Sequence, residues 1–290
     1  MQARHSRQRA FRFGLAIRII HPLPTSVNAV ASGGLALLAR QGRLNTWSLV
    51  HLILAMLAIQ AAIGIVNDLR DFELDALTKP AKPLIQGVIG VRTAQLAAAV
   101  SIALSVLLAT GFGLAAWTLA MGGLASGLVY DLWLKRTIAS ALPYLIGLPL
   151  LPLWVWTAVG RFQPALLALI PFGVMIGLAL HLANSLPDFE DDGRAGARGL
   201  VHRLGKRRAI QVCWATYGLT LAFVALSRTA VSYRGYLLLP GMTIASLALV
   251  VSIAAYQVNP SRASLQVGWT LLLLGSAILA VGWLGSLPPA

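Results

Sequence analysis

The sequence has little charge and almost no cysteine. Of its 290 residues, 11% are charged and 58% are hydrophobic, and Cys213 is the single cysteine. One cysteine excludes both an intramolecular disulfide and a multi-cysteine metal site. A chain with so few charges and so many apolar residues is neither intrinsically disordered nor a water-soluble globule. The composition therefore predicts an integral membrane protein.

Two common ligand-binding patterns are also missing. No glycine is followed by Lys and then Ser or Thr, so the sequence has no Walker A phosphate-binding loop. The histidines are scattered and none forms a ligand pair with cysteine, which argues against zinc. They are His5, His21, His51, His181 and His202.

The net charge is +14, from 23 Lys and Arg against nine Asp and Glu. A nucleic-acid-binding protein carries such an excess as a basic stripe on a polar fold, and this composition provides no polar fold. We therefore expect no nucleic-acid partner, and we assign the excess to contact with membrane lipid.

Long apolar runs predict the fold class. A helix needs roughly 20 residues to cross the hydrocarbon core of a bilayer, and nine runs approach that length. They are residues 24–40, 46–66, 93–110, 112–130, 139–159, 163–183, 209–227, 235–256 and 265–284. We expect an all-α membrane protein, a bundle of about nine transmembrane helices. Trp154 and Trp156 fall near the face opposite the acidic residues, where we interpret them as interfacial belt residues.

The distribution of Lys and Arg predicts the orientation, because cytoplasmic loops carry the positive excess. With the N-terminus inside, only Arg40, Arg43, Arg161, Arg228 and Arg234 of the 23 basic residues lie outside. All nine acidic residues then lie on the cytoplasmic side, so we expect an acidic active site there. The expected organisation is a basic cytoplasmic segment at residues 1–23 and one membrane domain at residues 24–290, with the C-terminus outside a bacterial or archaeal cell.

Two acidic clusters share one spacing. In each, an Asn is followed by Asp four and eight residues later, and the two triplets are Asn67, Asp71 and Asp75, and Asn184, Asp188 and Asp192. Residues four apart on a helix lie about one turn above each other, so each triplet predicts an axial row of oxygen ligands at a helix end. Two facing rows would form an acidic funnel. Such oxygen ligands favour Mg²⁺ or Mn²⁺, and Mg²⁺ prefers a few carboxylates together with substrate phosphate oxygens.

Other interpretations of the triplets stay open at this point. Carboxylates in a cytoplasmic loop can simply balance neighbouring basic residues. A cation-coupled secondary transporter could use two matched repeats as ion sites, although such sites usually lie near the middle of the membrane. A non-catalytic scaffold with a basic surface would leave the matched spacing unexplained.

The first cluster belongs to a longer motif, because residues 67–75 read NDLRDFELD and KPAKPLIQG follows at residues 79–87. This motif resembles the first signature of the UbiA superfamily of intramembrane prenyltransferases. The family pattern is NDxxDxxxD, followed by two basic-Pro pairs and a Gly. Family members usually have Arg where this chain has Lys79 and Lys82, which keeps the charge but removes the bidentate geometry of a guanidinium.

Two further segments are similar to family motifs. Residues 188–192 read DFEDD and lead through Gly196 to a Leu-Gly-Lys segment at residues 204–206, which is similar to the second aspartate motif. Residues 130–136 read YDLWLKR, where family members carry a Tyr and then a Lys-Arg pair. The three segments lie between about residues 67 and 208, a span of about half of the chain, and the predicted helix number agrees with the family fold.

The resemblance implies transfer of a prenyl chain from a polyprenyl diphosphate to a hydrophobic or aromatic acceptor, such as a quinone or lipid precursor, with release of pyrophosphate. Mg²⁺, or Mn²⁺ in its place, would neutralise the diphosphate. The implied metal ligands are Asn67, Asp68, Asp71, Asp75, Asn184, Asp188, Asp191 and Asp192. The implied diphosphate-binding residues are Lys79, Lys82, Lys135, Arg136 and Tyr130. The residues expected to be catalytic are Asp71, Asp75, Asp188, Asp192, Lys135 and Arg136.

The predicted topology can be tested by single-cysteine labelling in a Cys213→Ser background. Cysteines placed near Thr78 or Arg198 should react with an impermeant reagent only from the cytoplasmic side, because the Lys and Arg distribution holds both acidic loops there. Labelling of either position from the outer side would contradict the orientation.

Overall fold

The structure is a computed structural model, and it describes residues 15–135, 137–194, 196, 199–227 and 235–287. Within these residues there are nine long helices and eight short ones. The long helices are α2 (Pro22–Ala39), α3 (Thr46–Arg70), α5 (Val91–Thr110), α6 (Leu114–Val129), α7 (Leu142–Ala158), α8 (Leu169–Ser185), α11 (Lys206–Ser227), α12 (Gly235–Val258) and α13 (Arg262–Ser286). The short helices are η1 (Ile17–Ile20), α4 (Phe72–Thr78), η2 (Tyr130–Leu134), η3 (Ile138–Ala141), η4 (Pro164–Ala168), η5 (Leu186–Asp188), α9 (Phe189–Arg194) and α10 (Leu200–Leu204).

Each of the nine apolar runs corresponds to one long helix, so the all-α prediction is confirmed. The largest shift is at the run expected from residue 163, where a 3-10 turn begins at Pro164 and the regular helix α8 begins at Leu169. Seven helical segments among the described residues are long and apolar enough to cross a membrane, and they do not include α2 or α6. α6 has only 16 residues. Nine membrane crossings therefore stay a prediction.

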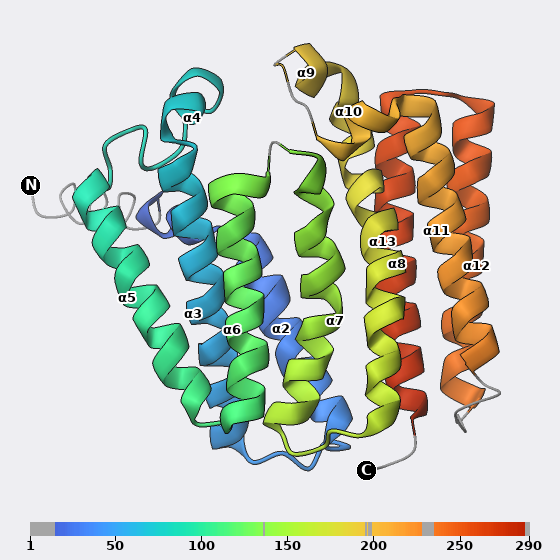
Figure 1. Cartoon of the computed structure of the whole chain (residues 1–290), viewed down its shortest axis with the longest axis horizontal. Coiled ribbons are helices and arrows are strands. Elements are labelled where there is room, and N and C mark those ends of the chain that lie inside the picture. Colours follow the sequence, from blue (N-terminus) through green and yellow to red (C-terminus); the bar gives the residue numbers. More distant parts are fainter. Residues whose placement is uncertain (1–14, 136, 195, 197–198, 228–234, 288–290) are drawn as a thin grey trace, which may run out of the picture.

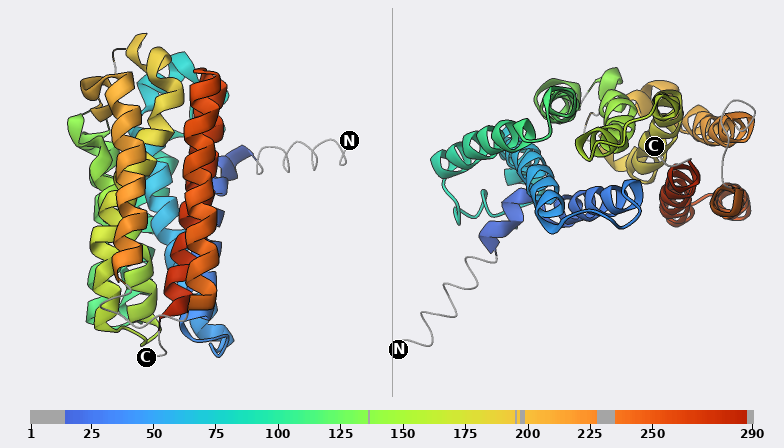
Figure 2. Two further views of the ribbon diagram at one scale, coloured as in Figure 1. Left: turned by 90° about the vertical axis from the view of Figure 1, so that its right-hand side faces the viewer. Right: turned by 90° about the horizontal axis from the view of Figure 1, so that it is seen from below.

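The long helices run side by side along one axis of the molecule (Figures 1 and 2). The short helices α4, α9 and α10 all lie at one end of this bundle, and the described C-terminal end of the chain lies at the other end (Figure 1). The two acidic segments are thus on the same end of the protein, as the alternation of loops predicts. The assignment of this end to the cytoplasm stays a prediction.

Glycines on α8 and α13 allow close helix packing. On α13, Gly268, Gly275 and Gly282 recur every seven residues, and an added Cβ on each would lie 2.7 to 2.9 Å from atoms that include α12 side chains or its backbone. On α8, Gly173 and Gly177 form a small-xxx-small pair that faces α7. Such spacing lets helix backbones approach in a membrane, where close packing contributes much of the association energy.

Gly177 brings the backbones of α7 and α8 close together near the acidic end. A Cβ there would lie 2.7 Å from the carbonyl oxygen of Tyr144 on α7, so a side chain can fit only if the backbone of α7 moves. We expect Gly177→Ala to destabilise the protein by about 1 to 3 kcal/mol, the usual cost of overpacking. Thermal unfolding in detergent measures this.

Gly34→Ala on α2 is the matched control, because an added Cβ at Gly34 would have nothing within 4 Å. Equal unfolding temperatures for Gly177→Ala and Gly34→Ala would contradict the close contact between α7 and α8.

Candidate active site

The first acidic triplet crosses a break between two helices. α3 ends at Arg70 and α4 begins at Phe72, so Asp71 lies between them, while Asn67 is on α3 and Asp75 is on α4. The backbone N–H of Asp71 still donates to the carbonyl of Asn67, and that of Asp75 donates to the carbonyl of Asp71. The expected row on a single regular helix is therefore wrong in detail. The break lets the chain turn over the bundle end while the carboxylates stay together.

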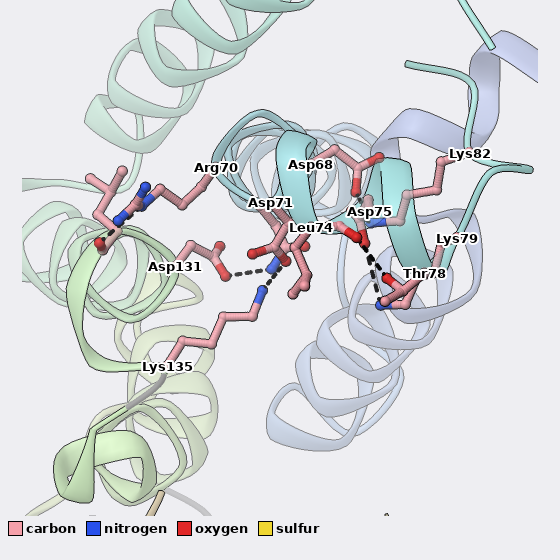
Figure 3. Close-up of polar contacts among 12 residues, drawn as sticks. Asp68, Arg70, Asp71, Leu74, Asp75, Thr78, Lys79, Lys82, Asp131 and Lys135 are labelled. Atoms are coloured by element: carbon pink, nitrogen blue, oxygen red, sulfur yellow. Dashed lines mark hydrogen bonds and ion pairs between the residues drawn. The ribbon is translucent and has the colours of Figure 1, made fainter. Parts of the chain in front are cut away.

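Lysine side chains neutralise the buried carboxylates of this motif. Asp68, Asp71 and Asp75 are each at most 5% exposed. Lys82 Nζ donates to Asp68 Oδ1 at 2.6 Å and to Asp75 Oδ2 at 2.5 Å, and Lys135 Nζ donates to Asp71. Figure 3 shows that Lys82 and Lys135 approach the motif from different segments of the chain. These pairs are needed because an uncompensated buried carboxylate is strongly unfavourable.

Lys82 links two parts of the motif. Burial disfavours its charged form, but hydrogen bonds from the ammonium group to Asp68 and Asp75 outweigh this effect, so the pKa of Lys82 lies above its ordinary value. Lys79 lies farther away, with Nζ 3.6 Å from Asp75 Oδ1, and its side chain is largely exposed. Lys82 is thus charged at neutral pH and fixed in place, whereas Lys79 can reach toward a ligand.

Asp131 joins the site from η2. Asn67 Nδ2 donates to Asp131 Oδ1 at 2.6 Å, and Asp131 is 4% exposed. Two buried carboxylate oxygens, Asp75 Oδ1 and Asp131 Oδ2, accept no hydrogen bond from the described part of the chain. Unsatisfied buried oxygens of this kind are suited to a hard divalent cation.

The second acidic motif is more exposed than the first. It begins on α8, where Asn184 Nδ2 donates to the Tyr144 hydroxyl at 3.3 Å, and continues through η5 into α9. Arg262, at the start of α13, donates to Asp188 and, at 2.7 Å, to Asp191 Oδ2. Both acids and the arginine are about half exposed. This second triplet passes through the 3-10 turn η5 between α8 and α9, so it too does not lie on one regular α-helix.

The two motifs are close enough for their charges to interact, but they do not form one set of metal ligands. The charges of Asp71 and Asp192 both interact with the Tyr130 hydroxyl, and the charge of Lys79 interacts with Asp192. Among the described residues, however, no three acidic, histidine or cysteine side chains are grouped closely enough to hold a metal ion. Most of the carboxylates are instead paired with Lys or Arg. The predicted site residue Arg136 lies outside the described residues.

Three side chains of the site were not among the predicted ligands. They are Asp131, His21, whose Nε2 lies 2.8 Å from Asp68 Oδ1, and Arg262. Asp131 had a sequence signal, since it follows Tyr130 in the third motif. Arg262 had none, because it lies more than 70 residues after the carboxylates that it binds.

A cavity of about 490 Å³ lies between α2, α3, α6 and α7. At one end its wall includes Asn67, Asp131 and Tyr130, and at the other end it includes Trp154. Between these ends the wall is mostly apolar. Trp154 and Trp156 are 2% and 3% exposed, so the interpretation of both as belt residues is wrong. The acidic end therefore opens into an apolar interior space.

Comparison with known proteins identifies the family. A sequence model of the UbiA prenyltransferase family matches residues 27–266. The chain is 26% identical to glycinol 4-dimethylallyltransferase of Glycine max, over 79% of this chain and 61% of that protein. It is 26% identical to digeranylgeranylglyceryl phosphate synthase of Natronomonas pharaonis, over 64% of this chain and 68% of that protein. The chain thus spans about three fifths of the length of the plant relative.

Solved structures share the fold. One concerns a digeranylgeranylglyceryl phosphate synthase in membranes, with a TM-score of 0.79 and 15% identity over 94% of this chain and 97% of that one. Another is a UbiA homologue from Archaeoglobus fulgidus bound to GPP and Mg²⁺, with a TM-score of 0.68 and 17% identity over 92% and 99%. At these identities the structures show the fold alone. Since the family model covers most of the sequence, the chain belongs to the UbiA prenyltransferase family.

Proposed function

We propose that this protein transfers a prenyl chain from a polyprenyl diphosphate to a hydrophobic or aromatic acceptor and releases pyrophosphate. The observation that carries the proposal is the position of the cavity, which begins at Asn67 and Asp131 beside the first acidic motif and continues into an apolar interior. A prenyl diphosphate has the matching polarity, with a charged head and a hydrocarbon tail. The head would lie at the bundle end and the tail in the cavity.

At the bundle end, the acidic residues would bind the diphosphate through Mg²⁺, and the basic residues would bind its oxygens directly. We assign Asn67, Asp71, Asp75 and Asp131 on one side, and Asp188 and Asp192 on the other, as the residues that would hold Mg²⁺. Bound there, the metal neutralises phosphate charge as a Lewis acid. Lys82 and Lys135 would remain beside the first motif and donate hydrogen bonds to phosphate oxygens. The exposed side chain of Lys79 is free to reorient toward the diphosphate when it binds.

The reaction requires an environment that excludes water. As the allylic carbon–oxygen bond breaks, its electron pair leaves with pyrophosphate and the prenyl carbon becomes a cation. The acceptor then forms a bond to this carbon and loses a proton. Tyr130 and Tyr144 both line the cavity near its acidic end, and aromatic faces stabilise a nearby cation. The apolar wall behind them would keep water from the reactive carbon.

The related proteins support the donor and the metal. The Archaeoglobus fulgidus homologue is described as bound to GPP and Mg²⁺, and a second structure of it as bound to DMAPP and Mg²⁺. The named relatives include a dimethylallyltransferase and a digeranylgeranylglyceryl phosphate synthase, so both aromatic and lipid-precursor acceptors stay within the proposal. We further propose that the site faces the cytoplasm of a bacterial or archaeal cell. The transporter hypothesis has no support here, because the acidic groups lie at the bundle end and most of them are paired with basic residues.

Removal of a metal ligand tests the proposed reaction. We expect Asp71→Ala and Asp188→Ala each to lower pyrophosphate release with prenyl diphosphate and acceptor by about 10² to 10³-fold, the usual loss when a group that stabilises developing charge is removed. Chelation of Mg²⁺ should have a similar effect on the unmodified protein. Pyrophosphate release in liposomes measures both.

Glu73→Ala is the matched control, since Glu73 is an exposed acid in the same segment. It should keep its activity. Near-normal turnover by Asp71→Ala or Asp188→Ala would remove that residue from the ligand set, and turnover unaffected by chelation would contradict a metal-dependent reaction.

The pairing of Arg262 with the second motif makes a further prediction. Arg262 competes with a cation for Asp188, so Arg262→Gln should bind Mn²⁺ about two to five times more tightly in the absence of donor, the range expected for a half-exposed ion pair. Titration followed by the electron paramagnetic resonance signal of free Mn²⁺ measures this. Weaker Mn²⁺ binding by Arg262→Gln would show that the arginine does not compete with the metal.

A further inference from the structure

We propose that Trp154, Phe112 and His51 form a floor that limits the donor to about three isoprenoid units. This inference rests on the proposed function, because it takes the cavity as the place of the donor tail. It adds a specificity determinant, namely the residues that set the length of chain that the cavity accepts.

The lining residues give the depth of the cavity. On α3 they run from Asn67 at the acidic end to Met56, and on α7 from Pro143 to Trp154. Each of these stretches spans 11 helical steps, which corresponds to about 16 Å at 1.5 Å per residue. An isoprenoid unit adds four chain bonds, or about 5 Å when extended. Three units therefore reach from the acidic end to the level of Trp154.

The floor is built from three aromatic rings in series. Trp154 on α7 meets the ring of Phe112 edge-on, with centroids 6.1 Å apart, and Phe112 stacks on His51 of α3 at 4.4 Å. His51 Nε2 lies 2.8 Å from the carbonyl oxygen of Leu108 at the end of α5. Gly111 packs so closely against His51 that an added Cβ would lie 2.4 Å from Cε1. The floor is therefore held by contacts with α3, α7, the end of α5 and the turn that follows α5.

Trp154 closes the cavity by the size of its ring and not by a hydrogen bond of its indole N–H. Its indole Nε1 is buried and has no hydrogen-bond partner among the described residues. A buried N–H without a partner is unfavourable, so the N–H contributes nothing to the floor. The ring, at 2% exposure, fills the end of the cavity and separates it from the far end of the bundle.

The floor predicts how binding depends on chain length. Each isoprenoid unit that enters the apolar cavity should tighten binding by about tenfold or more, because apolar surface leaves water. A fourth unit would meet Trp154 and would have to fold back or leave the cavity, so it should add no affinity.

Binding of unreactive donor analogues tests the proposal without an acceptor. The probes are the S-thiolodiphosphates of dimethylallyl, geranyl, farnesyl and geranylgeranyl chains, titrated calorimetrically with Mg²⁺ into the protein in nanodiscs. Affinity should rise from dimethylallyl to farnesyl and then level off. In Trp154→Ala it should rise again by about tenfold from farnesyl to geranylgeranyl, because removal of the indole opens the floor.

Trp156→Ala is the matched control, since Trp156 is an equally buried tryptophan on the same helix that lines a different cavity near Arg161. It should keep the wild-type profile. Trp154→Phe keeps a ring in the floor and should shift the profile less than Trp154→Ala. It decides the question if the alanine variant does not fold.

Two outcomes would overturn the floor while leaving the proposed function intact. One is a continued gain in affinity from farnesyl to geranylgeranyl in the wild-type protein. The other is a wild-type affinity profile in folded Trp154→Ala or, if that variant does not fold, in Trp154→Phe. Failure of all four analogues to bind in the presence of Mg²⁺ would instead overturn the proposed function itself.

Discussion

The structure depends on the neutralisation of buried carboxylates at the end of an apolar bundle. Asp68, Asp71, Asp75 and Asp131 are almost inaccessible to solvent, and such groups are tolerated only when they are paired or hydrogen-bonded. Lys82 and Lys135 supply positive charge to the first three, and Asn67 supplies a hydrogen bond to Asp131. The helix break at Asp71 and the short helix η2 after α6 place these charged side chains within reach of one another.

The need to neutralise these carboxylates also explains how the site could exist both without ligands and with a bound diphosphate and metal ions. In the structure, basic side chains occupy oxygens that the proposed reaction assigns to Mg²⁺, and Arg262 does so at the second motif. When a diphosphate and its metal ions bind, the added negative and positive charges would let the carboxylates exchange ammonium partners for metal while the lysines turn to phosphate. The local charge balance would stay close to neutral in both states, which is favourable in a region of low dielectric constant.

Much of the fold could be predicted because it follows from local patterns. Run length and apolar composition gave all nine helical segments, and loop alternation placed both acidic motifs at one end. The remaining features depend on contacts between distant residues. Arg262 reaches Asp188 from another helix, and the break at Asp71 is not visible in a spacing of four residues. Tryptophan is a common belt residue, and only the packing of the bundle, including the contact with Phe112, shows that Trp154 lies in the interior.

The central claim is that the two acidic motifs share one metal-bridged diphosphate above the cavity. The most direct measurement is an experimental structure with Mn²⁺ and farnesyl S-thiolodiphosphate, in which anomalous scattering locates the metal independently of the protein. The account predicts anomalous peaks between the diphosphate and both motifs, with Asp71 and Asp188 among the ligands and the tail directed toward Trp154. Metal peaks at one motif only, or a tail outside the cavity, would contradict it.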